Sequence, residues 1–208
     1  MTPTSLISIP CTRPRRASPL AGVAVALLAG CGSTAPQRPP SPIPRELLAE
    51  ARPIGAGPRF QPPSTGPVIG PCRARLGRRT EVHVELFAAN RVVIVPAGIG
   101  TRPPRALADG RITAARCYGE LVTIDPTGIV LVRPRPGVRL GSLFRSWGQP
   151  LSDRQLASFG GGRVVAFVNG RRWHGPPTNV PLTPRSEIVL EIGPHVPPHT
   201  SFTFPPGN

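Results

Sequence analysis

The sequence predicts an α+β fold rich in β-structure, built from a small mixed sheet with one helix crossing it. Short stretches of alternating polar and apolar residues, typical of strands, recur between residues 82 and 192. Strong turn sequences at residues 125–128 and 169–170 join such stretches in pairs. A single segment between these turns has the apolar spacing of a helix. Together these observations favour a β-rich domain with one helix.

An N-terminal hairpin is the first predicted element. Residues 82–87 and 91–95 alternate in polarity on either side of a short connection. A second pair of strands follows at residues 120–124 and 128–132, joined by a turn with Pro126 at its second position. We expect the first hairpin either to extend the sheet of the later strands or to form a small second sheet.

The helix is predicted over residues 140–147. Gly148 directly after it supplies a stop, because glycine readily adopts the left-handed conformation that ends helices. The apolar side chains occupy positions i, i+3, i+4 and i+7 of one face: Leu140, Leu143, Phe144 and Trp147.

Two further strands are predicted at residues 164–168 and 187–192. The first of them runs into Asn169-Gly170, the best short hairpin turn in the chain. From residue 120 to residue 192 the elements therefore follow the order ββαββ, as in β-grasp domains. This order alone leaves the pairing of the strands open.

The N-terminus has the features of a lipoprotein signal peptide, assigned to residues 1–30. Three arginines precede an apolar run at residues 17–29, which is too short to span a bilayer. The run ends in Leu28-Ala29-Gly30-Cys31, which resembles the lipobox of bacterial lipoproteins. We expect Cys31 to carry the lipid that anchors the protein to a membrane, on the extracytoplasmic side. The alternative is an ordinary secretory signal with a chance cysteine.

The exported chain divides into two parts. Residues 31–71 are rich in proline and are assigned to a lipid-anchored tether, because proline favours extended polyproline II structure. A polyproline ligand for a partner is the alternative function of this segment. Residues 72–208 are assigned to a single globular β-rich domain. Its extended, proline-rich C-terminal tail is predicted to dock Phe202 and Phe204 on the core.

Charge points to anionic partners. All 25 basic residues are arginine, and the net charge is +15. Such a field attracts lipid headgroups or anionic envelope polymers, whereas export separates the protein from nucleic acid. Alternatively, a GC-rich genome accounts for most of the arginine. The arginines singled out for an anionic partner are Arg73, Arg75, Arg78 and Arg79, or Arg171 and Arg172.

Cysteine usage fits an oxidising compartment. Cys72 and Cys117 remain once the signal peptide is removed and Cys31 is lipidated. A disulfide between them is the expected pairing.

The domain resembles a family of secreted or lipid-anchored bacterial domains of unknown function, over residues 72–208. The resemblance rests on the order and spacing of several landmarks rather than on one motif. They are Val95-Pro96-Ala97-Gly98-Ile99-Gly100, Cys117-Tyr118, Asp125-x-Thr127-Gly128-Ile129-Val130, Leu140-Gly141-x-x-Phe144-x-x-Trp147-Gly148, Val168-Asn169-Gly170 and Phe202-Thr203-Phe204-Pro205-Pro206-Gly207.

The chain departs from that family at its histidines. Members carry H-x-H-x-H-L on the first strand and H-T-H-D-x-S-G-x-I-H around the turn, a set able to converge on copper or zinc. Here only His83 remains on the first strand, and Val122, Ile124 and Leu131 replace the histidines of the hairpin. The resemblance thus implies a member that has lost most of its histidine cluster.

A reduced metal site around His83 is the hypothesis that follows. Glu81 and Glu85 share its strand face, and carboxylates with an imidazole are adequate ligands for zinc or copper. The alternative is an exposed polar face, or a His83 that pairs with a carboxylate. The other histidines lie in loops without ligand spacing and are predicted at the surface: His174, His195 and His199.

Catalytic motifs are missing from the sequence. It has no G-x-S-x-G, no H-E-x-x-H and no phosphate-binding glycine loop. The leading hypothesis is a non-catalytic binding or structural module of the cell envelope, with no cofactor. The second hypothesis is a copper- or zinc-binding envelope protein. The third is an enzyme, which requires a cleft with convergent polar groups.

Overall fold

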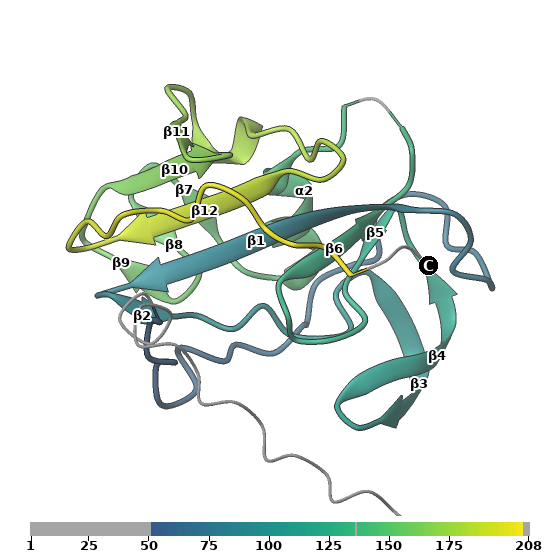
Figure 1. Cartoon of the computed structure of the whole chain (residues 1–208). Helices are drawn as coiled ribbons and strands as arrows, with labels where there is room; N and C mark the ends of the chain where they lie inside the picture. The colour runs from purple at the N-terminus through teal and green to yellow at the C-terminus, as the bar shows by residue number, and fades with distance from the viewer. Residues whose placement is uncertain (1–50, 136, 206–208) are drawn as a thin grey trace, which may run out of the picture. The chain divides into compact units, whose positions relative to one another are not determined.

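The structure of the protein, a computed structural model, describes residues 51–135 and 137–205 (Figure 1). A seven-stranded mixed sheet forms its centre, in the order β11-β10-β12-β1-β6-β5, with β2 paired to the end of β1. β12 and β1 run parallel, and the other neighbours are antiparallel. The strands are β1 (Thr80–Ala88), β2 (Arg91–Val92), β5 (Leu121–Val122), β6 (Ile129–Val132), β10 (Val164–Val168), β11 (Arg171–Arg172) and β12 (Glu187–Ile192).

One face of the sheet packs against the helix α2 (Leu140–Trp147) and forms the main hydrophobic core. Alternate residues of each strand point to this face, among them Val82, Val84 and Leu86 of β1. Trp147 is fully buried there, and its indole N–H donates to the Pro62 carbonyl over 3.1 Å. The helix ends at Gly148, which has a φ of +83° and donates to the Phe144 and Arg145 carbonyls.

The predicted α+β, β-rich class is confirmed, and the helix has the predicted bounds. The structure defines the order of the strands, which the sequence left open, and it places the first hairpin in the main sheet. β1, from the predicted N-terminal hairpin, lies in the centre between β12 and β6, whereas β5 is a two-residue strand at the edge. β1 takes the centre because it is long and has an apolar face along its whole length. Its hairpin partner β2 is only two residues long. Beyond it, the Val93 N–H donates to the Leu86 carbonyl and the Ile94 N–H donates to the Phe60 carbonyl.

A second hairpin was not predicted. β3 (Thr101–Ala108) and β4 (Arg111–Tyr118) form a separate two-stranded sheet that extends as an arm from the rest of the domain (Figure 1). The sequence of β3 contains prolines and arginines and therefore lacks the alternation of polar and apolar residues that is typical of a strand. The turn itself was recognisable, because Asp109-Gly110 is a typical hairpin dipeptide and both residues have positive φ.

Three further short strands follow the helix. They form a small antiparallel sheet of their own, ahead of β10, and a 3₁₀ turn lies between β11 and β12. These elements are β7 (Leu151–Ser152), β8 (Gln155–Leu156), β9 (Phe159–Gly160) and η1 (Pro177–Asn179).

Part of the segment assigned to the tether lies against the domain. The Gly55 N–H donates to the Val92 carbonyl, and the Thr65 N–H donates to the Trp147 carbonyl. Ile69 in turn accepts from the Glu120 N–H. The predicted signal peptide and Cys31 lie outside the described residues. Among the residues that are described, no helix has the length and hydropathy to cross a membrane.

The predicted disulfide between Cys72 and Cys117 is present, with 5.4 Å between the two Cα atoms. It joins the segment that leads into β1 to the end of β4. Paired backbone hydrogen bonds between Arg73 and Tyr118 continue the connection. The disulfide therefore attaches the base of the β3–β4 arm to the main sheet.

Candidate metal site on the outer face of the sheet

The outer face of the sheet, opposite the helix, carries acidic residues at its centre. Glu81, His83 and Glu85 project from β1, and Glu187 and Glu191 project from β12. The parallel pairing places Glu187 directly beside His83. A sheet interior is an unusual place for carboxylates, since burying a charge is costly unless it is paired or holds a cation.

The C-terminal tail covers this face. After β12 the chain turns back, and residues 194–205, yellow in Figure 1, cross in front of β12 and β1 toward β6. Phe202 stacks on the His83 ring with 3.7 Å between centroids, and Phe204 is buried beside it. The predicted docking of both aromatics is confirmed.

Two tail histidines pair with sheet glutamates. The Nδ1 atom of His195 lies 2.7 Å from Glu191 Oε2, and that of His199 lies 2.7 Å from Glu85 Oε2. Neither histidine was expected to contact another ionisable group. Their role was hidden because it depends on where the tail docks, which local sequence does not specify.

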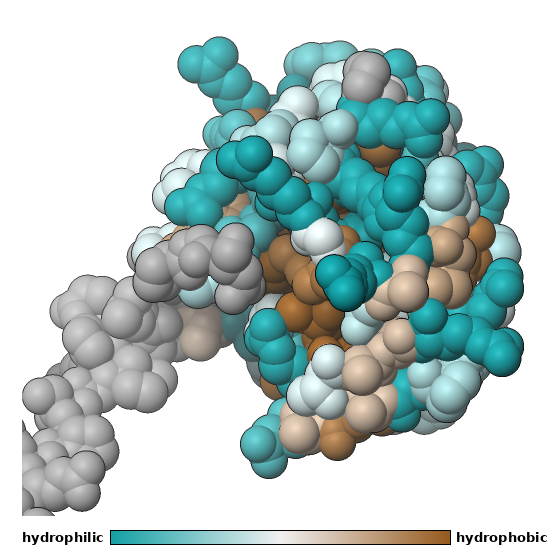
Figure 2. Space-filling model, turned by 90° about the vertical axis from the view of Figure 1, so that its right-hand side faces the viewer, coloured by the Kyte–Doolittle hydropathy of each residue, from teal (hydrophilic) through white to brown (hydrophobic). Residues whose placement is uncertain are grey.

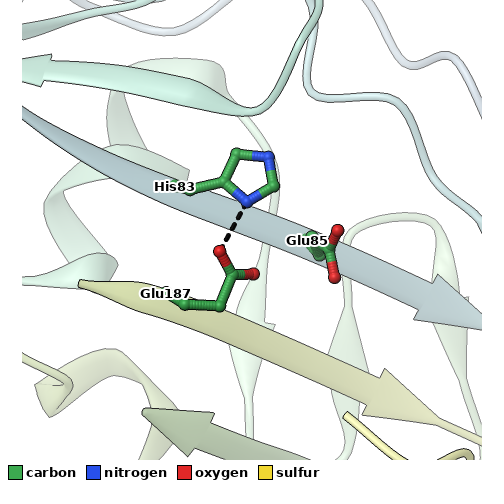
Figure 3. Close-up of side chains that lie close together, drawn as sticks. All are labelled: His83, Glu85 and Glu187. Atoms are coloured by element: carbon green, nitrogen blue, oxygen red, sulfur yellow. Dashed lines mark hydrogen bonds and ion pairs between the residues drawn. The ribbon is translucent and has the colours of Figure 1, made fainter. Parts of the chain in front are cut away.

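His83 is held by both ring nitrogens. Its Nδ1 atom lies 2.6 Å from Glu187 Oε2 (Figure 3). Its Nε2 atom lies 3.0 Å from the Thr127 carbonyl oxygen. A carbonyl oxygen only accepts, so Nε2 carries a proton and donates it. Nδ1 therefore faces the carboxylate, with one proton shared between them. This is the carboxylate pairing that was one alternative for His83.

Glu85 completes a group of three ligands. One ligand atom each from His83, Glu85 and Glu187 lies within 4.8 Å of the others. The second oxygen of Glu187, Oε1, is buried and has no hydrogen-bond partner in the described part of the chain. Burial raises the pKa of Glu187, which the hydrogen bond and charge of His83 partly oppose. An underpaired buried carboxylate beside an imidazole is a typical place for a cation.

The structure revises the predicted ligand set. Glu81 shares the strand face with His83, but its carboxylate accepts from Arg185 over 3.1 Å and stands outside the group. Glu187 takes its place, although 104 residues separate it from His83 in the sequence. The alternation of β12 does place Glu187 and Glu191 on one face, but only the sheet order brings that face to β1.

The three positions at which the resembling family has histidine offer no ligand here. Val122, Ile124 and Leu131 lie together in a buried apolar cluster with Ile112 and Tyr118. This cluster borders the sheet through β5 and β6. These three side chains therefore contribute to apolar packing and supply no metal ligand.

A small cavity lies beside His83 and Glu85. It has a volume of about 110 Å³, and its lining includes His83, Glu85 and the turn at residues 126–128. Gly128 in this turn has a φ of +81°, and a Cβ atom there would lie 3.0 Å from His83 Nε2 and 2.7 Å from the Val84 carbonyl oxygen. Only glycine lets the turn approach the imidazole so closely.

Of the arginines singled out from the sequence, Arg79 has a structural role. Its guanidinium donates to four backbone carbonyls, those of Leu76, Gly119, Glu120 and Leu131. Burial and the nearby charge of Arg133 lower the pKa of Arg79 to about 10. The other members of the set are exposed: Arg73, Arg75, Arg78, Arg171 and Arg172.

Glu187→Gln is expected to stabilise the metal-free protein at neutral pH. Burial raises the folded-state pKa of this carboxyl above its ordinary value of 4.5. Its stabilising contribution is therefore present at acid pH and is lost as the pH rises through the folded-state pKa. Urea unfolding in the presence of a chelator should show a gain for the variant at pH 7 that disappears near pH 4. A variant less stable than the native protein at pH 7 would contradict this.

Comparisons of the chain with protein-family models, with curated proteins and with solved structures found no significant match.

Proposed function

We propose that this protein is a non-catalytic, lipid-anchored module of the bacterial cell envelope that binds one divalent transition metal, zinc or copper, on its outer sheet face. The convergence of His83, Glu85 and Glu187 within 4.8 Å supports the proposal most strongly. These are nitrogen and oxygen ligands of the kind that zinc accepts, on two adjacent strands.

The environment of His83 suits a ligand. Histidines that bind metals usually donate their other ring N–H to a carbonyl or carboxylate, which fixes the tautomer. The Nε2–H bond to Thr127 has this role, and it leaves the Nδ1 atom directed at Glu187. A cation that replaces the shared proton gains the Nδ1 lone pair and the carboxylate together. Binding would therefore release a proton.

His199 is proposed as the fourth ligand. Its Nδ1 atom already lies 2.7 Å from Glu85 Oε2, within the reach of a small side-chain movement toward the cation. Two imidazoles and two carboxylates would make a closed four-coordinate site. A closed site fits a structural or storage role better than catalysis, which needs an open coordination position.

The proposed location rests on the N-terminal sequence. The lipobox-like Leu28-Ala29-Gly30-Cys31 and the proline-rich segment after it favour a lipid anchor and a tether. The Cys72–Cys117 disulfide is consistent with export. The resemblance to exported domains with a larger histidine set agrees with this location and with a reduced metal site.

We also propose a β-grasp-like arrangement for the sheet. Its central strands run in the order β10-β12-β1-β6, with the middle pair parallel and α2 on one face. In this arrangement β1, rather than residues 120–124, is the first strand of the ββαββ unit.

Metal titration with matched tail variants tests the proposed function. The full-length protein is titrated with Zn²⁺ and with Cu²⁺ against a competing chelator dye. We expect one ion per chain, and an affinity reduced roughly tenfold or more by His199→Gln. His195→Gln removes an equivalent pair between the tail and the sheet without touching the ligand group, so its affinity should stay within about twofold of the native value. Absence of binding at micromolar metal would overturn the proposal, as would equal losses in both variants.

A further inference from the structure

We propose that a groove beside β10, away from the metal site, binds a phosphoryl group. Three segments form it: the turn between β7 and β8, the start of β10, and the loop after β11. Two adjoining cavities of about 310 and 430 Å³ make up the groove, and both are lined by Asp153, Arg163, His174 and Gly175.

Positive charge dominates the lining. Arg154, Arg163, Arg172 and His174 face the groove, against the single carboxylate of Asp153. Within residues 51–135 and 137–205, the side chains of these four residues make no hydrogen bond and no ion pair. Some other surface arginines are by contrast paired, as Arg111 is with Asp125 and Arg185 with Glu81. The donors of the groove are therefore available to a ligand.

The floor of the groove is well defined. The Trp173 N–H donates to the Ala166 carbonyl over 2.8 Å, and the indole N–H donates to the Pro176 carbonyl over 3.1 Å. Gly175 lies against the indole, where a Cβ atom would come within 3.0 Å of its Nε1. Trp173, which lines part of the groove, is therefore held in place by these contacts.

The backbone at this edge is already engaged. The Val164 N–H donates to the Asp153 carbonyl over 2.8 Å, and the Ala166 carbonyl accepts from the Trp173 N–H. β11 pairs with Phe167 and Val168 at the end of β10. An added peptide strand would find few free partners here, whereas side-chain donors are plentiful. The groove therefore suits a compact anion rather than an extended peptide.

Phosphoryl oxygens match this set of donors. Guanidinium groups bind phosphate through paired, charge-assisted hydrogen bonds, and several arginines around one groove satisfy more than one oxygen. The net charge of +15 attracts such anions to the protein. Phosphoryl groups are presented both by phospholipid headgroups and by soluble or polymeric glycerol phosphates.

Hydrophilic residues cover much of the face seen in Figure 2, and brown hydrophobic residues show in a central hollow and at the right and lower edges. Because the net charge is +15, diffuse attraction of anions by the whole surface is the alternative to a defined site. Arg171 and Arg172 separate the two explanations, because they are neighbours on β11, both are exposed, and only Arg172 lines the groove.

The test titrates sn-glycerol 1-phosphate into full-length protein carrying Cys31→Ser, with a chelator present so that metal plays no part. We expect saturable binding that Arg163→Gln and Arg172→Gln each weaken by roughly tenfold. Arg171→Gln changes the net charge equally and should weaken binding by less than about twofold. Equal losses for Arg171→Gln and Arg172→Gln, or no saturable binding at millimolar ligand, would overturn the site.

Vesicles identify the source of the phosphoryl group. If phosphatidylglycerol vesicles bind the same protein more tightly than the soluble ligand does, with the same dependence on Arg172, the groove binds lipid headgroups. If the soluble ligand binds and the vesicles do not, the groove binds a free or polymer-borne phosphate. Either result supports the site, and vesicle binding that is insensitive to Arg172→Gln counts against it.

Discussion

Replacing His83 with glutamine is expected to abolish tight zinc binding, with an affinity more than roughly 100-fold lower than that of the native protein. His83 supplies the nitrogen ligand at the centre of the group, and both of its ring nitrogens are held in place. Glutamine is polar and similar in size, but its amide is a poor ligand for zinc. The two carboxylates and the single imidazole of His199 that remain cannot make a transition-metal site of comparable strength.

The measurement is a competition titration of the native and variant proteins with Zn²⁺. His174→Gln is the matched control, because His174 is exposed in the loop after β11 and lies outside the ligand group. The free energy of unfolding without metal is measured in parallel, so that misfolding is separated from loss of a ligand. Native affinity in a folded His83→Gln protein would rule out the proposed site.

Removing the disulfide is expected to cost about 4 kcal/mol of unfolding free energy. Cys72 and Cys117 are 45 residues apart in the sequence, and closing a loop of that length removes much conformational entropy from the unfolded chain. The double variant Cys72→Ser/Cys117→Ser therefore tests the contribution without leaving an unpaired thiol. Chemical denaturation at 25 °C measures the difference.

The native protein under reducing conditions is the control for the disulfide. It should lose the same stability as the double variant, because the same cross-link is missing. A double variant within about 1 kcal/mol of the oxidised native protein would show that the segment before β1 is held by its other contacts, such as the paired hydrogen bonds of Arg73 with Tyr118.

Local patterns predicted the elements whose periodicity is complete. The helix of residues 140–147 shows all its apolar positions and a glycine stop, and β12 has an apolar residue at every position of its core face. β3 escaped prediction because Pro103, Pro104 and its arginines leave no apolar alternation. The strand order was not readable either, since the pairing of β1 with β12 joins segments about 100 residues apart.

The candidate site was likewise predictable only where its residues lie close together in the sequence. His83 and Glu85 were identified because they are two residues apart on one strand, which puts both on the same face. Glu187 and His199 were not, since their contacts depend on tertiary structure. Parallel pairing places Glu187 beside His83, and docking of the tail brings His199 to Glu85. Glu81 was included among the predicted ligands because of its spacing alone, and in the structure it forms an ion pair with Arg185.

Anomalous X-ray diffraction at the zinc edge, from crystals grown with Zn²⁺, tests the central proposal most directly. We predict one strong anomalous peak per chain between His83 Nδ1 and the carboxylates of Glu85 and Glu187, at ligand distances of about 2.0–2.2 Å. The peak should vanish in His83→Gln crystals. A peak only at other surface residues, or none while His83 keeps its bond to Glu187, would contradict the account.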